Sequence, residues 1–216
     1  MTMAQEKVIS CEQCKATPCL FGYPEGMPAW CQARRYPDTI AEAKAMYLKP
    51  DNLRFHVSTA KVLKQGHDLW SRAQETIEFA RELEVKKLGF ACCVGLLREG
   101  KELVRIFRRA GFSDIVLVGC MIGGLKDTET GVPQEYGFPY GATCNPIAQA
   151  QILNREGTDL NVMVGLCIGH DTLFLKHAKA PVTIFAVKDR VACNNPTAVL
   201  FSPFHRARLR QAYGGD

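Results

Sequence analysis

The stretch from Asp159 to Asp171, which reads DLNVMVGLCIGHD, constrains the fold of this chain more than any other. Its first half is an almost unbroken apolar run, which predicts a strand buried on both faces, as in a parallel sheet. The run ends in a glycine turn, and Thr172 to His177 is predicted to form the next helix. Ligands of open α/β sheets bind outside the carboxyl ends of the strands. We therefore expect Cys167, His170 and Asp171 to lie where chemistry usually takes place.

Strand-like and helix-like segments alternate from residue 85 onward. The predicted strands cover residues 87–91, 113–119, 160–166 and 182–187. Amphipathic helices are predicted between them, over 95–110 and from the Asn145 N-cap and Pro146 to about Gly157. Such alternation is typical of an α/β fold, and we expect a small doubly wound, mostly parallel sheet of about four strands.

Two further segments precede this Rossmann-like α/β part. Residues 1–36 contain a stretch rich in Cys, Pro and Gly that shows neither a helical nor a strand period, and they are predicted to form a cysteine-rich metal knuckle. Residues 37–84 are predicted to be a helical connector. Its expected helices cover residues 39–48, 53–64 and, after a capping box, 71–83. The sequence therefore predicts three domains: 1–36, 37–84 and 85–216.

Four cysteines lie in the first of these segments. They are Cys11, Cys14, Cys19 and Cys31. A pair of thiolates two residues apart can turn onto one metal, and two more complete the tetrahedral sulfur site that zinc and iron–sulfur clusters use. Four unligated thiols would leave a segment without a core and with nothing to keep it folded. The spacing matches no ferredoxin run, so zinc and an iron–sulfur cluster both stay open.

A second set of cysteines is predicted at the carboxyl edge of the sheet. Its members are Cys93, Cys120, Cys144 and Cys167. In the common doubly wound order the first and third strands are neighbours, so Cys93 and Cys167 would face one crevice. We expect this set to bind an iron–sulfur cluster or another soft metal for redox, electron-transfer or sulfur chemistry, with His170 as an outer-shell donor or proton carrier and Asp171 capping the following helix. Cys92 and Cys193 are interpreted as ordinary small apolar residues.

Other functions stay open at this stage. Cys167 could be a catalytic thiolate activated by a helix N-terminus and by His170. The adjacent pair Cys92–Cys93 could close only a strained disulfide ring, so dithiol chemistry there ranks lower. A zinc-stabilised, non-catalytic interaction module would need only the four N-terminal cysteines. Nucleotide binding has little support, because no phosphate-binding loop or dinucleotide fingerprint occurs.

Composition bears on where the protein is expected to be located and on what it is expected to bind. The chain of 216 residues carries ten cysteines and a net charge of +5, and 47% of it is hydrophobic. It has no apolar run long enough to cross a bilayer, and its polar start lacks the apolar segment of a secretory signal. We therefore expect a cytoplasmic protein, in which cysteines serve metal or redox chemistry rather than disulfides. Its expected partner is a redox protein or a small-molecule substrate, rather than nucleic acid or a membrane.

Several motifs resemble one uncharacterised family. They are CxxCxxxxC near the start, CVGL, CNPIAQA, GLCIGHD and APVT, and the resemblance runs from about Cys11 to Pro196. The chain resembles the cysteine-rich "predicted metal-binding protein" family, a domain of unknown function from anaerobic bacteria and archaea. The resemblance implies metal binding but brings no reaction or substrate. Cys92 and Cys193 lie outside the family pattern, which supports leaving them out of the site.

Overall fold

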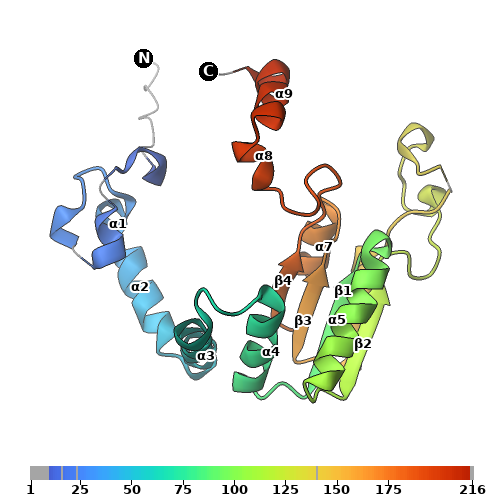
Figure 1. Cartoon of the computed structure of the whole chain (residues 1–216), viewed down its shortest axis with the longest axis horizontal. Coiled ribbons are helices and arrows are strands. Elements are labelled where there is room, and N and C mark those ends of the chain that lie inside the picture. Colours follow the sequence, from blue (N-terminus) through green and yellow to red (C-terminus); the bar gives the residue numbers. More distant parts are fainter. Residues whose placement is uncertain (1–9, 16, 23, 140, 215–216) are drawn as a thin grey trace. The chain divides into compact units, whose positions relative to one another are not determined.

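The computed structural model describes residues 10–15, 17–22, 24–139 and 141–214 (Figure 1). Contacts divide the chain into two compact units, Met1–Ala60 and Lys61–Asp216. The dividing point falls inside a 17-residue helix, α3 (Pro50–Gly66). The three-domain division at residues 36 and 84 stays a prediction.

The first unit is made of short helical pieces followed by two longer helices. Its elements are η1 (Cys11–Gln13), η2 (Pro18–Phe21), η3 (Pro24–Gly26), α1 (Gln32–Arg35), α2 (Pro37–Tyr47) and the first part of α3. The helices predicted at 39–48 and 53–64 are confirmed by α2 and α3. The second of them begins earlier than predicted, at Pro50, because a proline at the first helical position loses no hydrogen bond. No residue of α2 is buried.

The second unit is built on a four-stranded sheet. Its strands are β1 (Lys87–Cys92), β2 (Asp114–Gly119), β3 (Leu160–Val164) and β4 (Val182–Ala186). All neighbouring strands pair in parallel, and their order is β2-β1-β3-β4 (Figure 1). The predicted α/β fold is confirmed, including the placement of the first and third strands side by side. The two central strands are almost wholly buried, which explains their continuous apolar sequences.

Helices precede, connect and follow the strands of this sheet. They are α4 (Arg72–Glu82), α5 (Leu97–Arg109), α6 (Pro146–Glu156), α7 (His170–His177), α8 (Ala198–Phe201) and α9 (Pro203–Tyr213), with short turns η4 (Val94–Leu96), η5 (Asp127–Glu129) and η6 (Gln134–Tyr136). The predicted caps are confirmed: Ser71 accepts a hydrogen bond from the Gln74 amide, and Asn145 accepts one from the Ala148 amide. In the described part of the chain, no helix has the length and apolar character to span a membrane.

The crossovers place α5 and α6 on opposite faces of the sheet. The chain moves outward from β1 to β2 and then returns across β1 to β3, and right-handed connections in opposite directions lie on opposite faces. In Figure 1, α5 lies in front of β1 and β2. The core between these layers includes Phe90, Phe107, Leu153 and Phe174, each fully buried. This core fixes the strand ends from which the candidate site is built.

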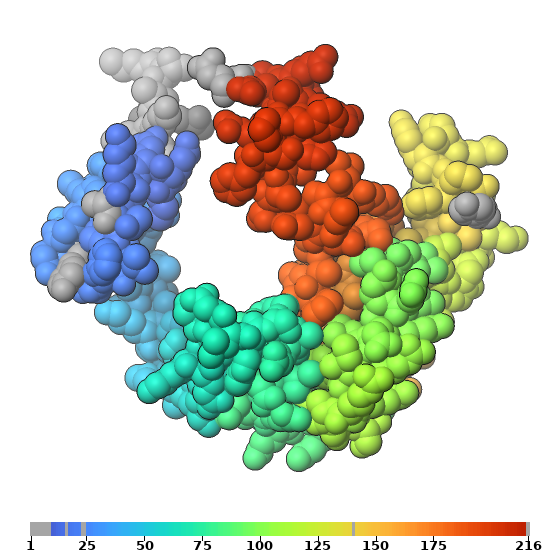
Figure 2. All heavy atoms as spheres, in the orientation of Figure 1, coloured from blue at the N-terminus to red at the C-terminus, as the bar shows by residue number. Residues whose placement is uncertain are grey.

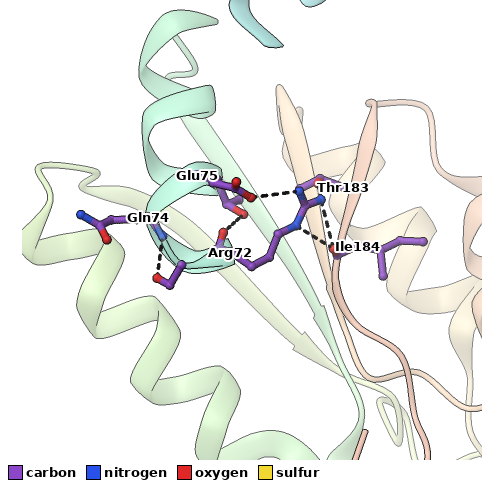
Figure 3. Close-up of polar contacts among 7 residues, drawn as sticks. Arg72, Gln74, Glu75, Thr183 and Ile184 are labelled. Carbon is purple, nitrogen blue, oxygen red and sulfur yellow. Dashed lines mark hydrogen bonds and ion pairs between the residues drawn. The ribbon is translucent and has the colours of Figure 1, made fainter. Parts of the chain in front are cut away.

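Arg72 of α4 covers the edge strand of the sheet. Its guanidinium donates to the Thr183 hydroxyl at 2.9 Å and to the Ile184 carbonyl at 3.3 Å, and Glu75 lies 3.7 Å from the same guanidinium (Figure 3). β4 ends the sheet on this side, so part of its backbone has no strand partner. Arg72 therefore supplies donors to the exposed edge and ties α4 to it.

Replacing Arg72 with alanine is expected to lower the free energy of unfolding by about 1 kcal/mol, because partly exposed hydrogen bonds contribute about that much. Urea unfolding followed by circular dichroism measures the change. The matched control is Arg98→Ala on the exposed face of α5. Equal stability of the two variants would contradict the stabilising role of Arg72.

Candidate functional site

Cys93 and Cys120 lie together at the carboxyl edge of the sheet. Each follows a strand directly, β1 and β2 respectively, and each is at least 96% buried. The Cys93 amide donates to the Val164 carbonyl at 3.0 Å, and the Cys120 amide donates to the Cys92 carbonyl at 2.8 Å. The strand ladder thus continues one residue past each strand and fixes both backbones.

The start of α6 brings Cys144 to the same place. The amide of Asn145, which caps α6, donates to the Cys120 carbonyl at 2.6 Å. The Cys144 sulfur then lies 3.5 Å from the Cys120 sulfur and 3.8 Å from the Met121 sulfur. Three of the four cysteines predicted to share this edge are therefore gathered by backbone hydrogen bonds.

Gln149 of α6 braces this arrangement from inside the protein. It is fully buried, and its side-chain amide donates to the Cys92 carbonyl at 3.2 Å and to the Val118 carbonyl at 2.8 Å. These carbonyls precede Cys93 and lie near Cys120, so Gln149 ties α6 to the ends of β1 and β2. Gln149 lies in the CNPIAQA motif that the family resemblance rests on, but the sequence alone suggested no role for it.

Among Cys93, Cys120 and Cys144, one sulfur accepts hydrogen bonds and the other two thiols keep their protons. The Val94 amide donates to the Cys120 sulfur at 3.2 Å, and the Cys93 thiol donates to the same atom. The hydrogen bond from Cys93, helped by Val94, lowers the pKa of Cys120, while that bond and then burial raise the pKa of Cys93. Burial raises the pKa of Cys144. Cys120 is therefore the preferred thiolate of the three.

Cys167 follows β3 at the same edge of the sheet as the other three cysteines, and its sulfur contacts a cation, the guanidinium of Arg190. The Arg190 guanidinium donates to the Cys167 sulfur at 3.3 Å. This hydrogen bond raises the pKa of Arg190, and the Cys93 and Cys144 thiols add smaller contributions. The four strand-end cysteines therefore share one electrostatic environment. Arg190 lies in the loop after β4 and was not singled out from the sequence.

The thiols of the two cysteines excluded from the predicted site have other surroundings. The Cys92 thiol donates to the carbonyls of Cys93 and Leu96, both at 3.3 Å, and burial is the main reason that its pKa is raised to about 12. Cys193 is exposed in a turn with a φ of +52°. Both positions fit structural roles.

His170 and Asp171 contact Cys167 through the backbone. Their amides donate to the Cys167 carbonyl at 3.0 and 3.1 Å, so α7 begins two residues before the predicted start at Thr172. Gly169, rather than Asp171, occupies the N-cap position. Atom Nδ1 of His170 is buried without a hydrogen-bond partner, and burial lowers the pKa of this imidazole.

A pocket of about 500 Å³ opens beside Cys167. One wall comes from the long segment between β2 and α6, whose residues 125–139 stand out in yellow in Figure 2. The other wall comes from the turn before α7 and the loop after β4. The lining residues are Asp127, Val132, Tyr136, Phe138, Thr143, Cys167, Ile168, His170 and Arg190.

The four N-terminal cysteines lie in the first unit, in or beside short helical turns. Cys11 and Cys19 are exposed, whereas Cys14 and Cys31 are half-buried. The Cys14 amide donates to the Cys11 carbonyl at 3.1 Å, which closes the turn between them. Among all described residues, no group of three or more His, Cys, Asp or Glu side chains stands ready-arranged to hold a metal ion. Metal binding at either cysteine set therefore stays a prediction.

Comparison with known proteins places the chain in a family. The family described as "Protein of unknown function (DUF1847)" matches residues 31–185. The chain belongs to the DUF1847 family. It is also 35% identical, over 93% of its own length and 98% of the relative's, to the uncharacterised protein MJ0455 of Methanocaldococcus jannaschii. The predicted resemblance to an uncharacterised family is confirmed, and the DUF1847 match spans all four strand-end cysteines but only Cys31 of the N-terminal four.

Proposed function

We propose that this DUF1847 protein binds a soft metal at a thiolate centre formed by Cys93, Cys120, Cys144 and Cys167. The observation that carries the proposal is the 3.5 Å separation of the Cys120 and Cys144 sulfurs, with the Cys93 thiol hydrogen-bonded to Cys120. A tetrahedral ion with metal–sulfur bonds of about 2.3 Å holds its ligands about 3.8 Å apart. The Cys120 and Cys144 thiols therefore need only small movements, and loss of their protons, to become ligands of one ion.

The surroundings supply the outer shell that such a centre needs. Amide and guanidinium donors already point at two of the sulfurs, from Val94 to Cys120 and from Arg190 to Cys167. Hydrogen bonds of this kind orient ligands and tune a metal centre. Four thiolates on a divalent ion leave a net charge of −2, and the cation of Arg190 offsets part of it.

The sulfur spacing bears on the kind of metal. A single ion such as zinc binds all its thiolates at one point, which suits sulfurs already in contact. An iron–sulfur cluster was the first expectation from the sequence. A [4Fe–4S] cluster binds each thiolate to a different iron and would require these sulfurs to separate, whereas a [2Fe–2S] cluster binds two thiolates to each iron and could accept the Cys120 and Cys144 sulfurs at their present spacing. Redox or electron-transfer use belongs to the cluster form, and a zinc form would instead be structural or Lewis-acidic.

Metal analysis of a protein without the N-terminal thiols tests the proposal. We define the knuckle-free variant as the chain in which all four N-terminal cysteines are replaced: Cys11→Ser, Cys14→Ser, Cys19→Ser and Cys31→Ser. Purified without oxygen, it is expected to retain zinc or iron, and acid-labile sulfide identifies a cluster. A knuckle-free variant that remains folded but takes up no zinc, iron or cobalt would refute the proposal.

Proton release gives a further prediction. The pKa values of Cys93 and Cys144 are raised, so both thiols carry protons at neutral pH and must lose them when metal binds. We expect at least two protons to be released per metal ion, one each from Cys93 and Cys144, and metal affinity to fall as the pH is lowered. Titration of the knuckle-free variant with zinc in buffers of different ionisation enthalpy measures this number. Binding without proton release would mean that these thiols are not ligands.

A second candidate function rests on the contact between Arg190 and Cys167 beside the pocket. A guanidinium stabilises a thiolate, and a thiolate at a ligand pocket can act as a nucleophile. In that role Arg190, rather than His170, is the group in contact with the sulfur. Iodoacetamide should then modify Cys167 first in the metal-free protein, and Arg190→Gln should slow the reaction. Equal rates in both proteins would exclude this function.

A further inference from the structure

The pocket beside Cys167 contains polar groups whose hydrogen-bonding capacity is unused. They come from three separate segments, which carry Asp127, His170 and Arg190. We propose that this pocket binds a small zwitterion of the amino-acid type, with its carboxylate on Arg190 and its ammonium group on Asp127. The binding site adjoins the thiolate centre, with which it shares Cys167 and Arg190, but it does not require metal.

Asp127 provides the anionic end. The residue is 93% buried, and one of its carboxylate oxygens accepts a hydrogen bond from the Phe138 amide at 3.1 Å. The other oxygen, Oδ1, is buried without a partner. A buried carboxylate oxygen without a donor is costly, so such an atom in a pocket wall indicates a ligand that donates to it. An ammonium group supplies both the donor and the opposite charge.

Arg190 provides the cationic end. It is exposed, and one nitrogen of its guanidinium contacts Cys167. It takes part in none of the ion pairs found among the described residues. A guanidinium has five N–H donors in a planar fork that matches a carboxylate, so most of its capacity is left for a ligand. The partnerless Nδ1 of His170 adds a further polar atom to this side of the pocket.

The remaining lining sets the size and character of the rest of the ligand. Tyr136 is 74% exposed and Ile168 is 91% exposed, and the half-exposed Phe138 lies on the same wall as Tyr136. Large apolar side chains around a polar pocket are typical of a ligand-binding rim. A volume of about 500 Å³ has room for a single amino acid. An apolar side chain on the ligand would cover this rim.

Thermal-shift assays with the common L-amino acids, one at a time, test the proposal on the full chain. We expect at least one amino acid, with an apolar side chain, to raise the melting temperature, because a ligand of the folded state stabilises it. Calorimetric titration then compares it with the acid that lacks its amine and the amine that lacks its carboxylate. Each analogue is expected to bind about tenfold or more weakly, and this comparison needs no variant.

Variants test which residues bind the two charged groups of the ligand. Asp127→Asn and Arg190→Gln are each expected to weaken binding of that amino acid about tenfold or more, whereas Asp114→Asn and Arg206→Gln on exposed surfaces leave it unchanged. Metal content measured on the same samples separates this result from the fate of the thiolate centre. The proposal is overturned if no amino acid shifts the melting temperature. It is also overturned if both analogues bind the unaltered protein as tightly as the amino acid does, or if both site variants bind the amino acid as tightly as the unaltered protein does.

Discussion

Replacing Cys120 with serine in the knuckle-free variant is expected to abolish metal binding. Cys120 is the central residue of the proposed site, because its sulfur accepts a hydrogen bond from the Cys93 thiol and lies 3.5 Å from the Cys144 sulfur. It is also the thiol whose pKa is lowered, so it is the first to bind as a thiolate. Loss of an outer-shell partner alone costs about 10–100-fold in metal affinity, and loss of this ligand should cost more than about a hundredfold.

Competition with a chromogenic zinc chelator measures that loss. The matched control is Cys193→Ser in the same background, since this thiol is exposed in a turn outside the site. The control is expected to bind metal as tightly as its parent. If the two serine variants bound metal equally well, the ligand set proposed here would be wrong.

Replacing Gly165 with alanine is expected to lower the free energy of unfolding by about 3 kcal/mol. Gly165 follows β3 with a φ of +65°, and a Cβ there would lie 2.1 Å from Cδ1 of Leu96, which is itself buried. The left-handed conformation costs about 1 kcal/mol for alanine, and crowding a packed side chain adds about 2 kcal/mol. Because this position leads directly into Cys167, the same change should also weaken metal binding.

Gly157→Ala separates the two causes. Gly157 ends α6 with the same φ of +65°, but a Cβ there would meet nothing within 4 Å. It is expected to cost about 1 kcal/mol, from the backbone conformation alone. Urea unfolding of both variants, followed by circular dichroism, gives the comparison. Equal losses at the two positions would show that the contact with Leu96 is not what requires glycine after β3.

The sheet could be predicted because its signals are local. The buried run from Leu160 to Val164 has the composition of a central parallel strand, and Asn145 before Pro146 marks a helix start whatever lies around it. The same local signals put the cysteines of the site at strand ends and at a helix start. Parallel topology then brought them to one edge, without any contact being read from the sequence.

The rest of the site depends on contacts between distant segments. Arg190 reaches a sulfur 23 residues earlier in the chain, and Asp127 lies in a long connection without hydrophobic period. Gln149 is a polar residue on the apolar face of its helix, and its role becomes clear only from its hydrogen bonds to two buried backbone carbonyls. Such residues carry no local signal, because their roles exist only once the strand ends are in place.

X-ray absorption at the metal edge of the knuckle-free variant tests the central claim most directly. A centre on Cys93, Cys120, Cys144 and Cys167 predicts a shell of four sulfurs, at about 2.3 Å if the metal is zinc. A shell of nitrogen and oxygen atoms, with no sulfur, would contradict the account.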